Sequence, residues 1–236
     1  MQDFTSTFGN SAAGALPEQR AQFIRKTYML LAATIAAFIA VEAVLFVTGA
    51  AYIFTSFVFG GGSLTWLLVL GVFMLITWLA NGWAASDTSK GLQYLGLLLY
   101  IVAEAIIFTP MILFAAVKAG DPYVIEKAGI VTLGLFLGIT ATVFLTKTDF
   151  SFLGPILAIG GFAALGFIVA SAIFGFTLGN VFAFVMVAFA GTAILYQTSN
   201  VLHRFRTDQH VAAALVLFAS VALLFWYILR IFSSRR

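Results

Sequence analysis

Seven long apolar segments alternate with short polar breaks along the chain of 236 residues. A transmembrane helix needs about 20 mostly apolar residues, because that length crosses the hydrocarbon core of a bilayer. All seven segments meet this requirement, and we predict a membrane-spanning helix over each. The predicted spans cover about residues 27–49, 64–85, 92–117, 124–145, 152–175, 178–202 and 211–233.

The breaks between the segments are short and rich in turn-forming residues. Examples are FGGGS at 59–63, AGDPY at 119–123 and RFRTDQ at 204–209. Short connections force neighbouring helices to run antiparallel within one compact bundle. The sequence therefore predicts an all-α integral membrane protein, with a seven-helix transmembrane domain at 23–236 and a cytoplasmic N-terminal tail at 1–22.

The N-terminal tail differs in character from the rest of the chain. Residues 1–16 are rich in Ser, Thr, Gly and Ala and have no sustained apolar period, so we expect them to be disordered. Pro17 suits the first turn of a helix, and PEQRAQFIRK is predicted to extend the first span. The tail lacks a basic segment followed by an apolar core, so it does not resemble a cleaved signal peptide.

The composition strengthens the membrane assignment. Hydrophobic residues make up 62% of the chain and charged residues 9%, whereas soluble domains have about 25% charged residues. The absence of cysteine excludes disulfides and thiolate metal sites. The net charge of +3 is small, and no basic face or base-stacking motif indicates a nucleic-acid partner.

Basic residues mark one end of the predicted bundle. The N-terminal flank and the loops on its side contain seven of them: Arg20, Arg25, Lys26, Lys90, Lys147, Arg204 and Arg206. The opposite loops contain only Lys118 and Lys127. Because Lys and Arg concentrate on the cytoplasmic side, we predict a cytoplasmic N-terminus. Seven full spans then place the C-terminus outside, despite Arg230, Arg235 and Arg236; a re-entrant last segment is the alternative.

Two acidic residues lie inside predicted spans. Glu42 lies about two turns from the outer end of the first span, where its side chain can reach the interface. Glu104 lies near the middle of the third span, and an ionisable residue at that depth is expected to face the bundle or a cavity. The sequence provides no Lys or Arg at this depth as a partner. Glu104 is therefore either a neutral, hydrogen-bonded residue or one that handles protons or cations.

A polar quartet, Gln197, Thr198, Ser199 and Asn200, occurs near the cytoplasmic end of the sixth span. Polar groups in an apolar setting cost free energy unless hydrogen bonds or water satisfy them. The quartet therefore either holds helices together near the interface or lines a pathway for cations or protons.

Three further residues carry packing and capping predictions. Gly134 and Gly138 form a small-xxx-small pattern, which permits close approach of helices. We expect them to pack inside the bundle, with a contact between two copies as the alternative. Asp149 precedes FSFLG and is expected to cap the N-terminus of the fifth span.

The residue inventory does not favour catalysis. Intramembrane hydrolysis needs a Ser with a base, a pair of aspartates or a metal-binding helix. The spans contain no pair of aspartates, and His203 and His210 lie outside them, seven residues apart across a loop. Two such histidines do not form a zinc site. We expect neither enzymatic activity nor a metal or cofactor.

Several stretches resemble a known family. ILYQTSNVLH, followed by VAAALVLFASVALLFWYILRIF, resembles the last two helices of the Bax inhibitor family of membrane proteins. TKTDFSFLGPIL at 146–157 is similar to that family's loop before its fifth helix. The combination, including TSN, is most similar to the bacterial YccA-type branch. The resemblance covers the chain from about residue 25 onward.

The resemblance implies both a fold and a set of functions. The implied fold has six helices around a central seventh. The implied activities are a pH-gated leak of cations, particularly calcium, and regulation of stress responses. The YccA-type branch further implies an association with the membrane-anchored AAA protease FtsH, as substrate and modulator, in a bacterial inner membrane.

The chain departs from the family pattern at two positions. Leak-competent members carry an Asp after the aromatic residue of the sixth helix and another in the middle of the seventh. Gln197 and Ser220 occupy these positions here. Two neighbouring carboxylates can share a proton, whereas Gln and Ser do not titrate, so we expect a neutral clasp in place of a pH sensor.

Two functions remain open from the sequence. The first is modulation of the AAA protease, with the N-terminal tail as a handle. The second is a cation or proton leak, for which the candidate residues are Glu104, Gln197, Asn200 and Ser220.

Overall fold

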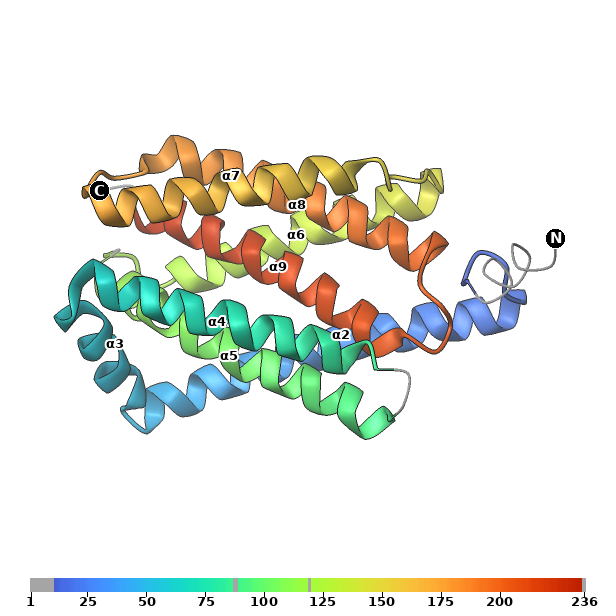
Figure 1. Cartoon of the computed structure of the whole chain (residues 1–236), viewed down its shortest axis with the longest axis horizontal. Coiled ribbons are helices and arrows are strands. Elements are labelled where there is room, and N and C mark those ends of the chain that lie inside the picture. Colours follow the sequence, from blue (N-terminus) through green and yellow to red (C-terminus); the bar gives the residue numbers. More distant parts are fainter. Residues whose placement is uncertain (1–10, 87–88, 119, 235–236) are drawn as a thin grey trace.

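A computed structural model describes residues 11–86, 89–118 and 120–234 (Figure 1). The regular structure of these residues is helical, apart from an isolated β-bridge between Ser11 and Arg206. The helices are α2 (Pro17–Val47), α3 (Ala50–Gly60), α4 (Gly62–Ala84), α5 (Lys90–Lys118), α6 (Val124–Thr146), α7 (Leu153–Phe174), α8 (Gly179–His203) and α9 (His210–Ser233).

Seven of these helices are long and apolar enough to cross a membrane. Each coincides with one predicted span, which confirms the seven-span prediction. Helices are favoured here because lipid offers no partners for backbone N–H and C=O groups, and a helix satisfies these groups internally. α2 begins at Pro17, so the predicted helical extension of the first span is also confirmed.

The short helix α3 was not predicted. It contains 11 residues, which is too short to cross a bilayer. Gly49 and Gly62, at its two ends, have φ angles of 78° and 68°. These left-handed conformations favour glycine and allow the chain to turn between α2 and α4.

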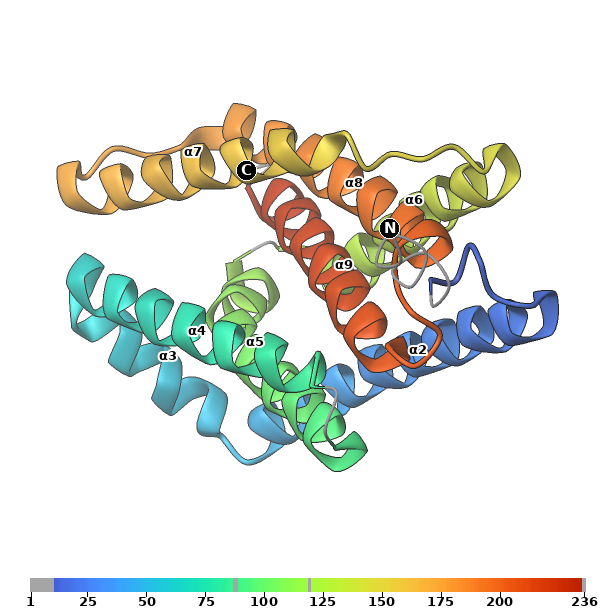
Figure 2. The ribbon, with the colours of Figure 1, turned by 45° about the vertical axis from the view of Figure 1, so that its right-hand side comes forward.

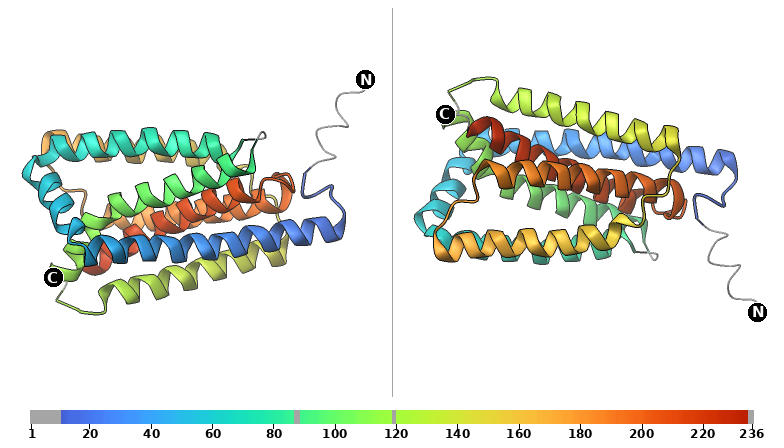
Figure 3. Two further views of the ribbon diagram at one scale, coloured as in Figure 1. Left: turned by 90° about the horizontal axis from the view of Figure 1, so that it is seen from below. Right: turned by 90° about the horizontal axis from the view of Figure 1, so that it is seen from above.

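The last helix, α9, forms the centre of the bundle (Figures 2 and 3). In its most apolar window 72% of the residues are buried, compared with 6% for α4 and for α7. Both views of Figure 3 place α4 and α7 on one face and α2 and α6 on the other, with α9 between them. The predicted arrangement of six spans around a central seventh is confirmed.

The two ends of the transmembrane domain lie at opposite ends of the bundle. α9 is one continuous helix, and its last turn lies at the end of the bundle opposite the start of α2 (Figure 1). This arrangement agrees with seven full spans and not with a re-entrant last segment. We call the end that holds the start of α2 and the α8–α9 loop the N-terminal end.

We expected residues 1–16 to be disordered, and this expectation is wrong for residues 11–16. Ala12 is fully buried, and its backbone N–H donates a hydrogen bond of 2.8 Å to the carbonyl oxygen of Phe205 in the α8–α9 loop. Arg20 reinforces this contact by donating to the carbonyl oxygen of Leu202 at 3.3 Å. The small side chains of SAAGAL at 11–16 permit this docking. Residues 1–10 lie outside the described residues.

The expectation that Gly134 and Gly138 pack inside the bundle is also wrong. Both are exposed on α6, and a Cβ atom built at either position meets nothing within 4 Å. The inward face of α6 is formed instead by Thr132, Phe136 and Thr140. The four-residue spacing of the glycines places both on the lipid-facing side, where a contact between copies stays untested.

Close helix approach occurs instead at Gly96, between α4 and α5. A Cβ atom at this position would lie 2.6 Å from the carbonyl oxygen of Ala80 and 2.8 Å from the backbone nitrogen of Ala84. Backbone atoms cannot move away as a flexible side chain can. The contact therefore requires glycine.

We predict that Gly96→Ala destabilises the protein and that Gly134→Ala does not. The added methyl group at position 96 forces α4 and α5 apart, and overpacking of this kind costs about 1–3 kcal/mol. The measurement is the thermal unfolding midpoint of each purified variant in the same detergent. Equal midpoints for Gly96→Ala and the unmodified protein would contradict the close contact.

Candidate functional site

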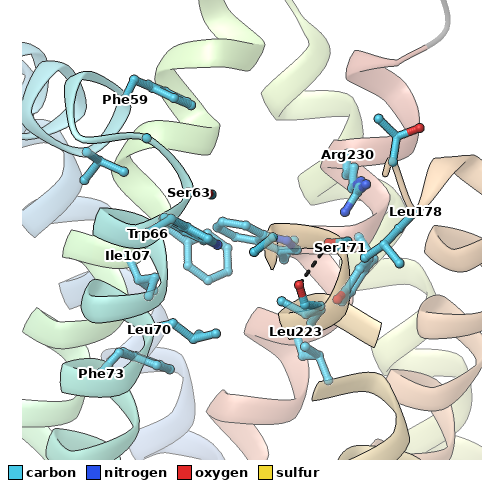
Figure 4. Close-up of a pocket in the computed structure, with 18 of the residues that line it drawn as sticks. Phe59, Ser63, Trp66, Leu70, Phe73, Ile107, Ser171, Leu178, Leu223 and Arg230 are labelled. Carbon is cyan, nitrogen blue, oxygen red and sulfur yellow. Dashed lines mark hydrogen bonds between the residues drawn. The ribbon is translucent and has the colours of Figure 1, made fainter. Parts of the chain in front are cut away.

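A cavity of about 610 Å³ lies in the half of the bundle away from the N-terminal end. One wall is formed by α3 and α4, the opposite wall by α7 and the α7–α8 loop, and α5 and α9 contribute the base. Figure 4 shows Trp66, Leu70 and Phe73 of α4 facing Ser171, Leu178 and Leu223 across this space. We refer to it as the α4–α7 cavity.

Glu104 of α5 lines the α4–α7 cavity. Its side chain is almost completely buried, with 5% of the residue exposed. Its Oε2 atom has no hydrogen-bond partner among the described residues, and Tyr100, one turn earlier on α5, interacts with its carboxyl group. This position agrees with the prediction from the sequence that Glu104 faces the bundle or a cavity.

Arg230 provides a second charge at the rim of this cavity. It lies in the last turn of α9 and is directed into the cavity (Figure 4). Phe108 and Trp226 pack edge to face at 4.8 Å, which brings α5 and α9 into register. Glu104 lies one turn before Phe108 and Arg230 one turn after Trp226, so the two charges are separated by about 11 Å along the helix axes.

The other buried acid, Glu42, lies outside the lining of this cavity. Its Oε2 atom accepts a hydrogen bond of 3.3 Å from the hydroxyl group of Thr109, which also donates to the carbonyl oxygen of Ala105 at 2.9 Å. Only 6% of Glu42 is exposed, so its side chain does not reach the interface as expected. Thr109 of α5 is therefore a partner for one carboxyl oxygen of Glu42, whereas Oε1 has no hydrogen-bond partner among the described residues.

The polar quartet of α8 lies toward the N-terminal end, apart from the cavity lining. The structure brings Gln197 and Asn200 together: the Asn200 side-chain amide donates to Gln197 Oε1 at 3.3 Å. Thr198 and Ser199 are fully buried. Within the described part of the chain, the Thr198 hydroxyl and Asn200 Oδ1 have no hydrogen-bond partner.

Ser199 connects α8 to the loop before α7. Its Oγ atom accepts a hydrogen bond of 2.9 Å from the backbone N–H of Phe150 and donates to Asp149 Oδ1 at 3.4 Å. His203 Nδ1 lies 3.0 Å from the carbonyl oxygen of Ser199. Ser199 therefore holds α8 to the loop before α7.

Asp149 does not cap α7 as expected. α7 begins at Leu153, and its N-cap residue is Phe152, because Asp149 lies too far before the first turn. Its Oδ1 atom instead accepts a hydrogen bond of 2.9 Å from the backbone N–H of Ser151. This bond, supported by the nearby charges of His203 and Arg204, holds the pKa of Asp149 below its usual value.

The expected clasp between Gln197 and Ser220 is not formed among the described residues. Ser220 is buried and donates to the carbonyl oxygen of Val216 at 2.9 Å, one turn earlier on α9. Gln197 is bonded within α8, as described above. A short hydroxyl group in a helix bonds most easily to its own backbone, which explains why Ser220 does not reach across.

The aromatic residues of the cavity could not be identified from the sequence. Trp66 and Trp226 lie toward the ends of spans, and tryptophan at that depth ordinarily marks the membrane interface. Val58 and Phe59 belong to α3, which was not predicted. The partner of Glu42, Thr109, was weakly indicated by the sequence, since hydroxyl-bearing residues inside spans are often interhelical hydrogen-bond donors.

Comparisons with known proteins agree with this architecture. A family described as "Inhibitor of apoptosis-promoting Bax1" matches residues 20–236. The chain is 30% identical to "Bax inhibitor 1" of Schizosaccharomyces pombe over 223 residues, which are 90% of this chain and 76% of the yeast protein. The chain belongs to the Bax inhibitor family.

Two other relatives show the range of this family. The "Golgi anti-apoptotic protein" of Vaccinia virus is 26% identical over 238 residues, covering 95% of this chain and 90% of the viral protein. An uncharacterized protein of Pseudomonas aeruginosa is 35% identical over 112 residues, covering 46% and 49%. The Bax inhibitor family therefore accounts for the multi-span membrane architecture.

Proposed function

We propose that this Bax inhibitor family protein provides a weak leak for cations or protons, with Glu104 as the ionisable group. The observation that carries the proposal is that Glu104 lines the α4–α7 cavity and has a buried carboxyl oxygen with no hydrogen-bond partner among the described residues. Ionisable residues at mid-membrane depth commonly mark ion or proton pathways. Calcium and protons are the candidate ions.

The proposed leak lacks a gate made of paired carboxylates. Gln197 and Ser220 do not titrate, and each forms its hydrogen bond within its own helix. A pair of carboxylates would respond to pH because like charges raise one of the two pKa values. Asn200 and the other members of the quartet then serve as structural polar contacts or as part of the pathway near the N-terminal end.

We predict that the unmodified protein shows no steep pH response in its leak. Flux of calcium and of protons would be measured in liposomes that contain only this protein, between about pH 5 and 8, and compared with the double variant Gln197→Asp, Ser220→Asp. The double variant should gain a pH response because it restores two interacting carboxyls. A steep response in the unmodified protein that persists in Glu104→Gln would reject this mechanism.

We predict that Glu104→Gln abolishes residual flux and leaves thermal stability nearly unchanged. Glutamine keeps the shape and hydrogen-bonding capacity of the side chain but cannot exchange a proton or neutralise a cation. The matched control is Glu42→Gln, which alters the other buried acid outside the cavity lining. Undiminished flux through a folded Glu104→Gln variant would show that Glu104 has only a structural role.

A second candidate function is modulation of the membrane-anchored AAA protease FtsH, as in the YccA-type branch. On this proposal the protein is a substrate that resists extraction and so occupies the protease. Two features support it: α2 extends from the membrane domain to Pro17, and the preceding segment contacts the α8–α9 loop through individual hydrogen bonds such as that from Ala12 N–H to the Phe205 carbonyl oxygen. Each such bond contributes only about 0.5–1.5 kcal/mol, so the protease can release the segment.

The same proposal includes a location and an orientation. We place the protein in the inner membrane of a bacterium, with the N-terminus in the cytoplasm. Basic residues concentrate at the N-terminal end of the bundle, among them Arg20, Lys26 and Arg204. Positive charge of this kind favours the cytoplasmic side and attracts anionic lipid headgroups.

We predict that deletion of residues 2–10 lengthens the half-life of the protein in cells that contain the protease. The comparison variant is Ala12→Glu, in which a charged side chain cannot occupy the buried position of Ala12. It should release the segment and shorten the half-life. Identical protease-dependent half-lives for both variants and the unmodified protein would place the handle elsewhere.

A further inference from the structure

We propose that the α4–α7 cavity binds a hydrophobic organic cation, whose positive group lies between the Glu104 carboxyl and the surrounding aromatic rings. This inference rests on the proposed cation-handling role of Glu104 and names the class of cation. It concerns occupancy of the cavity at equilibrium, which is measured separately from flux.

The first argument is the unsatisfied carboxyl oxygen of Glu104. Glu104 is 5% exposed and its Oε2 atom has no partner among the described residues. A buried carboxyl oxygen without a hydrogen bond or an opposite charge costs free energy. A positively charged ligand in the cavity would remove that cost, and the gain would contribute directly to its affinity.

The second argument is the aromatic lining. The aromatic side chains that line the cavity include Trp66, Phe73, Phe108 and Trp226, which come from three helices. The faces of such rings attract cations, tryptophan most strongly, and the attraction is greatest where water is excluded. Organic ammonium groups are the usual ligands of sites that combine aromatic rings in this way.

The third argument separates organic from inorganic cations. Calcium requires about 6–8 oxygen ligands. Apart from Glu104, the described lining offers side-chain oxygens only from Ser63, Ser171, Thr177 and Tyr227. The Ser171 hydroxyl already donates to the carbonyl oxygen of Ile168 at 2.9 Å. These side chains alone do not provide enough oxygens to hold calcium in the cavity at equilibrium, whereas a bulky organic cation binds water weakly and needs no such shell of oxygen ligands.

The fourth argument concerns access. Arg230 at the rim repels cations that approach from the aqueous side. α4 and α7, which form the two walls, are the least buried spans and expose most of their apolar surface to lipid. A hydrophobic cation concentrates in the membrane and can approach between these helices. The cavity volume of about 610 Å³ falls within the range of about 300–1,000 Å³ for sites that hold drug-sized ligands.

Arg230 also defines the competing interpretation. An anionic amphiphile would pair with its guanidinium group, which has no salt-bridge partner among the described residues. The cation is favoured because Glu104 is deeply buried at the base of the cavity, whereas Arg230 is only half-buried at its rim, where water can solvate its charge.

The experiment uses two probes of the same shape and opposite charge. Binding of tetraphenylphosphonium and of tetraphenylborate to the full chain in lipid nanodiscs is measured by equilibrium dialysis, with empty nanodiscs as the baseline for partitioning into lipid. We expect saturable binding of tetraphenylphosphonium only. Millimolar calcium should not displace it.

Three variants test the assignment of residues. Glu104→Gln should weaken tetraphenylphosphonium binding by at least about tenfold, as expected for loss of a charged partner in a water-excluded site. Trp226→Leu should weaken it by about two- to tenfold. Glu42→Gln should leave it unchanged. Glu104→Asp retains the charge and should bind more tightly than Glu104→Gln, which separates loss of charge from misfolding.

The outcomes are distinct from those of the leak experiments. Equal binding of tetraphenylphosphonium by Glu104→Gln, or no saturable binding at all, would overturn the inference. Preferential binding of tetraphenylborate that is lost in Arg230→Gln would establish the anionic ligand instead. Saturable, Glu104-dependent binding without any flux would uphold this inference while the proposed leak fails.

Discussion

The complete enclosure of α9 is the constraint on which the rest of the bundle depends. Lipid surrounds the domain, yet most of α9 contacts only protein, including α2, α5, α6 and α8. Small residues such as Ala213, Ala214 and Ala222 are buried along it and allow its neighbours to approach. α4 and α7 contribute less to this enclosure and lie on one face of the bundle, which leaves room between them for the α4–α7 cavity.

Hydropathy predicted the spans but not their positions in the bundle. The mean hydropathy of α9 is 2.4, and that of α7 is also 2.4, although 72% of one window and 6% of the other are buried. Lipid and protein interiors are similarly apolar, so sequence alone does not separate the two environments. The central position of α9 was expected only from the resemblance to the family, whereas its burial is now observed directly.

The candidate site was predictable only in part, for a related reason. The depth of Glu104 followed from its distance to both ends of a span. The walls of its cavity, however, come from α3, α4, α7 and the α7–α8 loop, whose apolar residues carry no pattern that separates cavity from lipid. The contact between Ser199 and Asp149 joins residues 50 positions apart. The small-xxx-small pattern also failed to predict close helix packing. Gly96 makes a close contact and Gly134 does not, although both are glycines within apolar helices.

The two polar regions of the bundle lie at different depths, and this separation determines what any switch must do. The quartet on α8 and its loop contacts lie toward the N-terminal end, whereas Glu104 and the cavity open toward the other. Between them α9 buries Leu217, Phe218 and Leu224, a layer that excludes water. Gln197 and Ser220 cannot move this layer by changing charge. The proposed ligand of the α4–α7 cavity would contact α9 directly, because Leu223 and Trp226 belong both to the cavity lining and to α9. On that proposal, ligand binding rather than titration of paired carboxylates would couple the cavity to α9.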